Sequence, residues 1–165
     1  MLVIGLTGNI GCGKSSLSQI FAQQNIKIID ADIIAREIYN DEKLIQLNKM
    51  THPLIRQRVS DKIDEYKNQN KEMVILDAAL LVESDYLNFI DKLLVVICNE
   101  DIQIERIKQR DNCSKEEALS RIKSQMSQEE KVKYADYIID NSGTIEELRK
   151  KAFAFMDYIK EKCCE

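Results

Sequence analysis

The sequence is poor in residues that interrupt helices, and it has no long apolar run. Its 165 residues contain one proline, Pro53, only five glycines and no tryptophan. So few turn-forming residues favour an architecture with long helices over an all-β fold. The longest uninterrupted apolar stretch, residues 93–98, is far shorter than the roughly 20 residues that span a bilayer. No membrane segment is therefore expected.

Cysteine is present, but its pattern fits neither a disulfide framework nor a zinc site. The five cysteines are an odd number and include no C-x-x-C pair, and Cys163 and Cys164 are adjacent. The first residues run directly into a glycine-rich loop, without the basic leader that a signal peptide would have. These features predict reduced thiols and a cytoplasmic location.

A strong positive charge is also lacking. The formal net charge is −4, and charges of both signs alternate from residue 100 to residue 150. Proteins dedicated to nucleic acids are usually basic on one face, so no nucleic-acid partner is expected. Most of these charges are typical of solvated helix surfaces. The length predicts one domain over residues 1–165.

Short apolar segments alternate with helical patterns along the chain. Strands are expected at 2–7, 26–29, 73–76, 93–98 and 137–140, and helices at 14–24, 30–40, 43–70, 101–110, 114–133 and from 144 onward. A break is expected at His52-Pro53, because the residue before a proline avoids helical geometry. Strands separated by helices predict an α/β fold with a five-stranded parallel sheet covered by helices on both faces.

Three of the five glycines lie within residues 8–13, beside a lysine. Residues 8–15 match the pattern G-x-x-x-x-G-K-[ST] between an expected strand and an expected helix, which is the context of a phosphate-binding P-loop. Such a loop points main-chain N–H groups at a phosphate, and the helix N-terminus adds positive partial charge. The predicted nucleotide-binding residues are Gly8, Gly11, Cys12, Gly13, Lys14, Ser15 and Ser16.

The side chains of this loop predict ATP and Mg²⁺ as cofactors, in a three-layer P-loop NTPase-type fold. Lys14 is expected to reach the β- and γ-phosphates, Ser15 to ligate Mg²⁺ directly and Ser16 to add a phosphate contact. A tight turn with an incidental lysine is the alternative. A GTPase is excluded, because D-x-x-G occurs only at 140–143, after the last strand, and residues 48–51 lack the aspartate of N-K-x-D.

A small-molecule kinase needs a carboxylate near the acceptor hydroxyl and an aspartate that organises the metal. Asp30 and Asp32 follow the second strand, where Asp30 is suited to cap the next helix. Asp32 is better placed to meet an acceptor, although a surface pair with Arg36 is an equal alternative. Asp77 ends the third strand, where it would hold Mg²⁺ through water or merely cap the strand.

Arginines that close over phosphates are the third requirement. Arg106 and Arg110 lie four residues apart on one helix face, and Arg121 follows in the next helix. Arginine suits bidentate phosphate contact, but simple solvation is the alternative for each of them. His52 is the only histidine, and a lone histidine is more often structural than catalytic.

Taken together, these stretches resemble the dephospho-CoA kinases, which carry out the ATP-dependent last step of coenzyme A synthesis. The matching pieces, in the family's order, are IGLTGNIGCGKS, IIDADIIARE, HPLI, VILDAALLVES, QRDNCSKEEALSRIKSQMS and ADYIIDNSGTIEELR. The P-loop is shared by many kinases, whereas DADIIAR combined with HPLI and ADYIIDNSG is far more specific. The resemblance implies ATP-dependent phosphorylation of the ribose 3′-hydroxyl of dephospho-CoA.

The resemblance also implies roles around the acceptor. The resemblance implies that Asp32 is the base that takes the proton from the 3′-hydroxyl. The expected catalytic residues are Asp32, Lys14 and Arg110. Arg36 and His52 are implied to lie on the acceptor side, and Asp77 is also expected among the substrate-binding residues because it ends the third strand.

Further from the acceptor, the resemblance implies a lid and an adenine pocket. Residues 111–133 would form a mobile lid over ATP, and Arg110 would stabilise the transferring phosphoryl group. Asn141 and Gly143, in the NSG stretch, would form part of the adenine pocket.

The sequence departs from the family's pattern in three places. Ala79 stands where the family has proline, and Asn25 replaces a usual glycine. Only DEKLIQLNKMT joins DADIIAREIYN to HPLI, where the family has a longer helical segment with an L-D-R motif. The helical acceptor-binding part, at about 36–70, is therefore expected to be reduced. There are two alternatives. One is a kinase for another small hydroxyl or nucleotide acceptor, and the other is an ATP-binding regulatory module without transfer activity.

Overall fold

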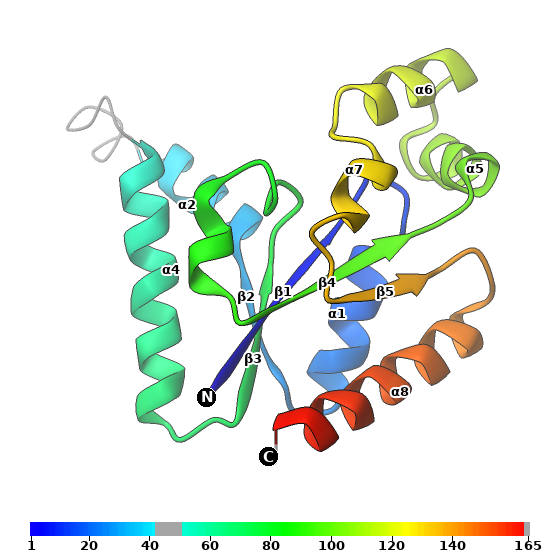
Figure 1. The fold of residues 1–165 in the computed structure, drawn as a ribbon. Coiled ribbons are helices and arrows are strands. Elements are labelled where there is room, and N and C mark those ends of the chain that lie inside the picture. The colour runs from blue at the N-terminus through cyan, green and yellow to red at the C-terminus, as the bar shows by residue number, and fades with distance from the viewer. Residues whose placement is uncertain (42–50, 164–165) are drawn as a thin grey trace.

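The computed structural model describes residues 1–41 and 51–163, and the side chains of 51, 52 and 163 also lie outside the description (Figure 1). The elements are β1 (Leu2–Gly8), α1 (Lys14–Gln23), β2 (Lys27–Asp30), α2 (Ala31–Asn40), α4 (Thr51–Asn68), β3 (Met73–Asp77), the 3₁₀ helix η1 (Asp85–Phe89), β4 (Lys92–Ile97), α5 (Glu100–Asp111), α6 (Lys115–Lys123), α7 (Gln128–Val132), β5 (Tyr137–Asp140) and α8 (Ile145–Cys163).

The five strands form one parallel sheet in the order β2-β3-β1-β4-β5. This confirms the predicted five-stranded parallel sheet, with strand ends within about one residue of their expected places. β1 lies at the centre, and β3 separates it from β2. Leu6 pairs with Asp77, and Asp77 pairs with Asp30, so three strands end side by side. The P-loop and both aspartates therefore share the carboxyl edge of the sheet.

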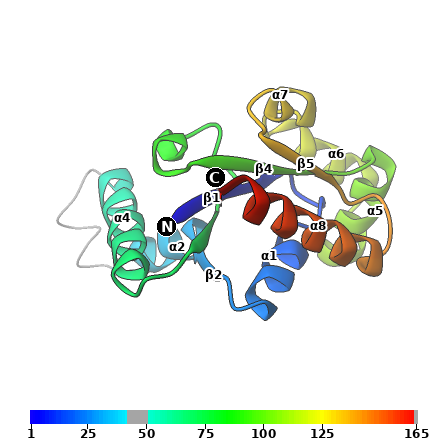
Figure 2. The ribbon, with the colours of Figure 1, turned by 60° about the horizontal axis from the view of Figure 1, so that its bottom comes forward.

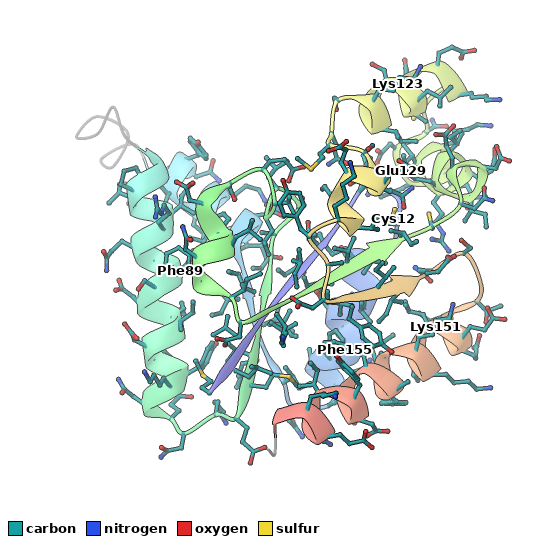
Figure 3. All side chains as sticks on the ribbon, in the orientation of Figure 1. Cys12, Phe89, Lys123, Glu129, Lys151 and Phe155 are labelled. Atoms are coloured by element: carbon teal, nitrogen blue, oxygen red, sulfur yellow. The ribbon has the colours of Figure 1, made fainter. Side chains whose placement is uncertain are left out.

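Helices cover both faces of the sheet, as Figure 2 shows from a second direction. On one face, α1 and α8 pack through a core in which the rings of Phe21 and Phe155 lie 5.8 Å apart. Phe155 points from α8 toward the sheet (Figure 3). The other face carries a second core, to which α4, residues 78–90 and α7 contribute. Among the described residues, no helix has the length and apolar character that crossing a bilayer requires.

Two expectations about helix boundaries need comment. The single helix expected at 114–133 is wrong, because α6 ends at Lys123 and Ser127 caps a separate α7 by accepting from the Glu130 N–H at 3.2 Å. The break expected at His52-Pro53 is a helix start instead, since α4 begins at Thr51. Proline is tolerated in a first turn, where no intrahelical N–H bond is lost. Residues 43–50 of the helix expected at 43–70 lie outside the described residues.

Asn25 joins α1 to β2 in an unusual backbone conformation. Its φ is 62°, in the left-handed region that favours glycine and that asparagine tolerates better than most residues. This left-handed conformation explains why glycine is usual at position 25 and why asparagine can replace it.

Candidate active site

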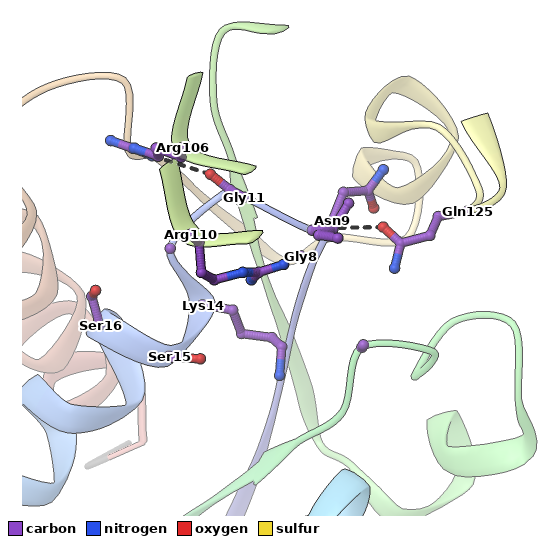
Figure 4. Close-up of a pocket in the computed structure, with 12 residues that line it drawn as sticks. Gly8, Asn9, Gly11, Lys14, Ser15, Ser16, Arg106, Arg110 and Gln125 are labelled. Carbon is purple, nitrogen blue, oxygen red and sulfur yellow. Dashed lines mark hydrogen bonds between the residues drawn. The ribbon is translucent and has the colours of Figure 1, made fainter. Parts of the chain in front are cut away.

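The P-loop encloses a cavity of about 440 Å³ at the carboxyl edge of the sheet (Figure 4). Gly11 and Gly13 have φ values of 79° and 84°, and α1 begins immediately after Gly13. A Cβ on Gly13 would lie 2.1 Å from Asn141 Nδ2, so no larger residue fits there without displacing Asn141. The predicted residues that line the cavity are Gly8, Gly11, Gly13, Lys14, Ser15, Ser16 and Arg110.

Lys14 lies between two carboxylates. Its Nζ forms an ion pair with Asp77 and lies 3.7 Å from Asp32 Oδ2. Ser18 Oγ donates a hydrogen bond to the second oxygen of Asp77. Ser18 was not identified from the sequence, although its place one turn after Lys14 puts it on the same face of α1 and could have indicated it. The structure therefore brings Lys14, Asp32 and Asp77 together, as the sequence predicted.

Asp77 is almost fully buried, and this burial raises the pKa of its carboxyl group. Contacts with Lys14 and Ser18 oppose the shift without cancelling it. When the pKa of a carboxyl group is higher in the folded protein than in the unfolded one, the folded state binds the proton more tightly. Protonation of the group then increases the free energy of unfolding, and ionisation decreases it. Its ionisation therefore costs stability at neutral pH, and this cost disappears as the pH falls to about 3.8, the ordinary carboxyl value.

Replacing Asp77 by Asn is expected to leave the protein at least as stable as wild type at pH 7.5. The variant removes a buried charge, so its advantage in melting temperature should shrink as the pH is lowered toward 4.5. Thermal unfolding followed by circular dichroism at both pH values would measure this. A loss of more than about 4 °C at pH 7.5, roughly 1 kcal/mol for a chain of this size, would contradict it.

Asp32 and Asp30 have different roles at the start of α2. Asp30 Oδ1 accepts from the Ile33 N–H at 2.9 Å, which confirms the expected helix cap. The Asp32 carboxylate is 44% exposed, and its Oδ2 accepts from the Ala79 N–H at 3.2 Å. Arg36 Nε contacts the main-chain oxygen of Asp32 at 3.4 Å rather than its carboxylate. The contacts of Asp32 with the Ala79 N–H and Lys14 thus favour the acceptor-facing alternative over a surface pair with Arg36.

Each of the three candidate arginines has a polar partner, and Arg110 and Arg121 share one. Arg106 donates to the Asn141 carbonyl at 2.8 Å and to the Gly11 carbonyl at 3.4 Å, and it lines the cavity (Figure 4). Arg110 also lines the cavity, and its guanidinium holds Asp111 through bonds of 2.8 and 2.9 Å. Its hydrogen bond holds the pKa of the Asp111 carboxyl below the usual value.

Arg121 pairs with the same Asp111 carboxylate and is not among the residues that line the cavity. One carboxylate therefore links α5 to α6, and it keeps Arg110 and Arg121 close together. This arrangement differs from simple solvation, the alternative considered for both arginines.

Residues distant in sequence hold the tip of the P-loop. The Ile10 N–H donates to Gln125 Oε1 at 2.9 Å, and Asn9 Nδ2 donates to the Met126 carbonyl at 2.8 Å. Gln103 Nε2 donates to the Ile10 carbonyl at 2.6 Å. No local pattern in the sequence indicates these partners, because more than 90 positions separate them from the loop.

Three predicted nucleotide-binding residues do not line the cavity. The Cys12 side chain is buried, and a hydrogen bond with Cys98 together with burial raises the pKa of its thiol. Asn141 Nδ2 donates to the Cys12 carbonyl at 2.9 Å, which ties the segment that follows β5 to the P-loop. A Cβ on Gly143 would lie 1.6 Å from Glu147 Oε2, so this glycine leaves room for a side chain of α8.

The predicted roles of the site residues stay predictions, and two assignments in particular have no support from this geometry. The place of Asn141 and Gly143 in an adenine pocket stays a prediction. The side chain of His52, predicted on the acceptor side, lies outside the described residues.

The donor set of the cavity suits Mg²⁺ carried in with a nucleotide. Ser15 lines the cavity, and the Asp77 carboxylate pairs with Lys14, which also lines it. In residues 1–41 and 51–163, no cluster of three acidic, histidine or cysteine side chains could hold an ion by itself. Mg²⁺ is commonly held by one or two protein oxygens plus substrate phosphates, so Ser15 and Asp77 fit this ion.

Comparison with known proteins agrees with this geometry. The family model for dephospho-CoA kinase matches residues 2–45 and 38–147. Dephospho-CoA kinase of Bacillus thuringiensis is 40% identical over 180 residues, covering 87% of this chain and 90% of the relative. That of Oceanobacillus iheyensis is 40% identical over 184 residues, with 90% and 92% covered. The aligned part of this chain is shorter than either alignment, so the relatives have residues without a counterpart here.

Solved structures show the same fold. A Thermus thermophilus protein superposes with a TM-score of 0.76 at 24% identity, covering 95% of this chain and 97% of that one. Dephospho-CoA kinase from Campylobacter jejuni superposes with a TM-score of 0.71 at 26% identity, covering 97% and 98%. A shikimate kinase from Bacteroides thetaiotaomicron shares the fold at 17% identity, with a TM-score of 0.66 and 96% and 98% covered. On its sequence and its P-loop site, the chain belongs to the dephospho-CoA kinase family.

Proposed function

We propose that this chain transfers the γ-phosphoryl group of ATP to the ribose 3′-hydroxyl of dephospho-CoA, yielding coenzyme A and ADP. The observation that carries the proposal is the Asp32 carboxylate, which lies 3.7 Å from the P-loop lysine and is partly open to solvent. A carboxylate beside the phosphate site can accept the proton of an acceptor hydroxyl during in-line transfer. The pattern of reduced thiols in the sequence supports a cytoplasmic setting for the reaction.

The cationic residues have separate tasks in this proposal. Lys14 neutralises charge on the β- and γ-phosphates, and Arg110 stabilises the phosphoryl group as it moves between donor and acceptor. Residues 111–133 act as the lid, and Arg121 reaches the phosphates when the lid closes. The shared contact with Asp111 supports this, because it keeps Arg121 close to Arg110, which lines the cavity.

Mg²⁺ would be held by the Ser15 hydroxyl directly and by Asp77 through water, together with phosphate oxygens. When bound, the ion supplies neutralisation of the charge on the bridging phosphates. The contact between Asp77 and Ser18 orients the carboxylate for this task. Lys14 contacts both Asp77, proposed to hold the metal ion, and Asp32, proposed to bind the acceptor hydroxyl.

The acceptor-binding part, at about 36–70, is proposed to be a reduced one. The two matches to the family model overlap at residues 38–45, which supports the proposal that the missing segment lies next to α2. A second cavity of about 310 Å³ lies against α4, where Pro53 and Arg56 face Ser84 and Tyr86. Burial and the nearby negative charge of Asp32 raise the pKa of Tyr86, so this cavity lies close to Asp32.

Release of ADP from Mg-ATP, measured with and without dephospho-CoA, tests the proposal. Dephospho-CoA is expected to stimulate release at least about tenfold, because acceptor binding completes the site. The reduced segment makes another acceptor worth testing, so AMP and adenosine, which share the ribose hydroxyl but lack the pantetheine arm, belong in the same assay. Equal stimulation by AMP would point to a nucleotide acceptor. If the protein binds ATP tightly but none of the acceptors stimulates release of ADP, a regulatory module without transfer activity would be favoured.

A further inference from the structure

Two thiols meet beside the P-loop, at a place that the proposed reaction does not use. Cys12 lies in the loop itself, and Cys98 directly follows β4, which pairs with β1 in the sheet. Both are free thiols, and both belong to the core beneath α1 and α8. The two thiols share a hydrogen bond, and Cys98 Sγ also donates to the Gly11 carbonyl at 3.7 Å. The fold thus brings two cysteines that are far apart in the sequence into contact.

This contact does not depend on residues 111–133, the segment proposed as the lid. One thiol is carried by the P-loop and the other by the end of an interior strand. Gln128, in the lid segment, covers the pair, because its Oε1 accepts from the Cys12 thiol at 3.5 Å and from the Cys98 N–H at 2.8 Å. Movement of the lid would remove this cover and leave the two thiols in contact with each other.

Cys98 is the more reactive of the two thiols. It lines a cavity of about 590 Å³ between the start of α5 and residues 122–129, through which a small oxidant can approach it. The hydrogen bond from Cys12 and the positive charge of Arg106 lower the pKa of the Cys98 thiol, although burial opposes this shift. The pKa of the fully buried Cys12 thiol is raised. Because the thiolate is the nucleophile in thiol chemistry, Cys98 is the residue that reacts first.

Packing alone does not explain a pair of thiols at this place. A buried cysteine packs as a small apolar side chain, so other small apolar residues could fill the same volume. What only two adjacent cysteines can do is join in a disulfide bond. In reducing compartments, protein disulfides are mostly transient and redox-sensing, which agrees with two free thiols in contact.

A disulfide bond at this place would deform the phosphate cradle. The bond is about 2.05 Å long, far shorter than a contact between unbonded sulfur atoms, so residue 12 must move toward Cys98. The main chain around residue 12 has little freedom, because Gly11 and Gly13 are in left-handed conformations and Asn141 Nδ2 binds the Cys12 carbonyl at 2.9 Å. The N–H groups of this stretch are those that bind phosphate in a P-loop. Movement of residue 12 therefore displaces groups that hold the nucleotide.

We propose that Cys12 and Cys98 form a redox modification site, at which hydrogen peroxide produces a disulfide bond that weakens nucleotide binding. This site is separate from the acceptor side of the protein. The inference needs only nucleotide binding at the P-loop, so it holds whichever acceptor the protein uses.

The reaction takes place in two steps. The Cys98 thiolate attacks one oxygen of the peroxide, the O–O bond breaks, and the leaving hydroxide takes up a proton to become water. The Cys12 sulfur then attacks the sulfur of the Cys98 sulfenic acid. An S–S bond forms, the S–O bond breaks, and the hydroxyl leaves with the Cys12 proton as a second water. Two electrons pass from the sulfur atoms to the peroxide, and a dithiol reverses the bond by exchange.

Peptide mapping and nucleotide affinity, measured on the same sample, test the proposal. The wild-type protein is treated with hydrogen peroxide, and its remaining thiols are blocked before proteolysis. Mass spectrometry is expected to find a pair of peptides linked through Cys12 and Cys98. The Kd for Mg-ATP, measured by titration calorimetry, should rise at least about tenfold, the effect of losing one hydrogen bond to a charged group. Dithiothreitol should restore the affinity of the reduced protein.

Two outcomes of this experiment would overturn the inference. One is the absence of the linked peptides after peroxide treatment. The other is a linked protein that binds Mg-ATP as tightly as the reduced one. Neither measurement needs a variant, so both apply even if a cysteine replacement does not fold.

Variants isolate the pair from the other three cysteines. In Cys113→Ser/Cys163→Ser/Cys164→Ser, the two-cysteine variant, only Cys12 and Cys98 remain. Peroxide should weaken its binding of Mg-ATP as it does in wild type, each oxidised sample being compared with its own reduced form. Adding Cys98→Ser should abolish the effect, because Cys12 then has no thiol partner. Equal weakening with and without Cys98 would mean that oxidation elsewhere is responsible, and the inference would be wrong.

Circular dichroism shows whether the disulfide acts locally. The oxidised protein should keep the helical signal of the reduced protein, because the bond joins residues that are already in contact. An oxidised protein that loses its helical signal together with its affinity would contradict the inference, since unfolding would then explain the loss.

Discussion

Lys14→Met is expected to lower kcat/KM for Mg-ATP by about three orders of magnitude, because it removes the cation proposed to neutralise the β- and γ-phosphates. The same change should destabilise the fold by about 3 kcal/mol, since it leaves a buried carboxylate, Asp77, without its cation. Steady-state kinetics and urea unfolding at pH 7.5 measure the two effects. The loss of stability should shrink at lower pH, where protonation of Asp77 removes the uncompensated charge.

The double variant Lys14→Met/Asp77→Asn separates these two effects. It has no unpaired buried charge, so its stability should recover most of the loss while its activity stays low. If activity returned together with stability, Lys14 would be a structural residue and its proposed contact with the phosphates would be wrong.

Asp32→Asn is expected to reduce kcat for dephospho-CoA phosphorylation by about a thousandfold, which is within the range of general-base contributions. Asparagine still has an oxygen that can accept from the Ala79 N–H, but it cannot take a proton from the acceptor hydroxyl. Binding of ATP should change little, because the main-chain groups of the P-loop are intact. Product formation and nucleotide affinity, measured on the same preparation, test both parts.

Asp30→Asn is the matched control for this variant. Asp30 lies two residues earlier and caps α2, a task that asparagine performs nearly as well as aspartate. Its activity should stay close to wild type. A fall in kcat similar to that of Asp32→Asn would mean that the charge around Asp77, rather than proton transfer, determines the rate.

The main elements of the fold follow from local patterns in the sequence. The run at 2–7 is apolar because β1 is the central strand and is buried on both faces. Gly11 and Gly13 occupy conformations that other residues rarely adopt, so the P-loop could be recognised from spacing alone. The helix predicted at 114–133 was wrong because Ser124 and Ser127 permit either continuation or a fresh cap, and only packing decides between them.

The identities of the P-loop lysine and the two aspartates were also predictable, but their partners were not. Lys14, Asp32 and Asp77 each follow a strand or loop whose place in the sheet the pattern indicates. Their mutual contacts depend on β3 lying between β1 and β2, a strand order that composition and periodicity do not specify. Lys131 is fully buried and donates to the Ala79 carbonyl, yet it had no signal at all, because a buried lysine and a solvated one look alike in a charged helical stretch.

The sequence by itself therefore determined which phosphate chemistry this protein can perform, because a P-loop is a continuous motif whose spacing alone creates the cradle. Only the tertiary structure decided how that cradle is held and which distant residues lie around it. Gln125, Lys131 and Asn141 act across 115, 52 and 129 positions of sequence. Their hydrogen bonds exist only when the P-loop and the sheet are packed against the segments at 125–131 and after β5, and no local pattern encodes such contacts.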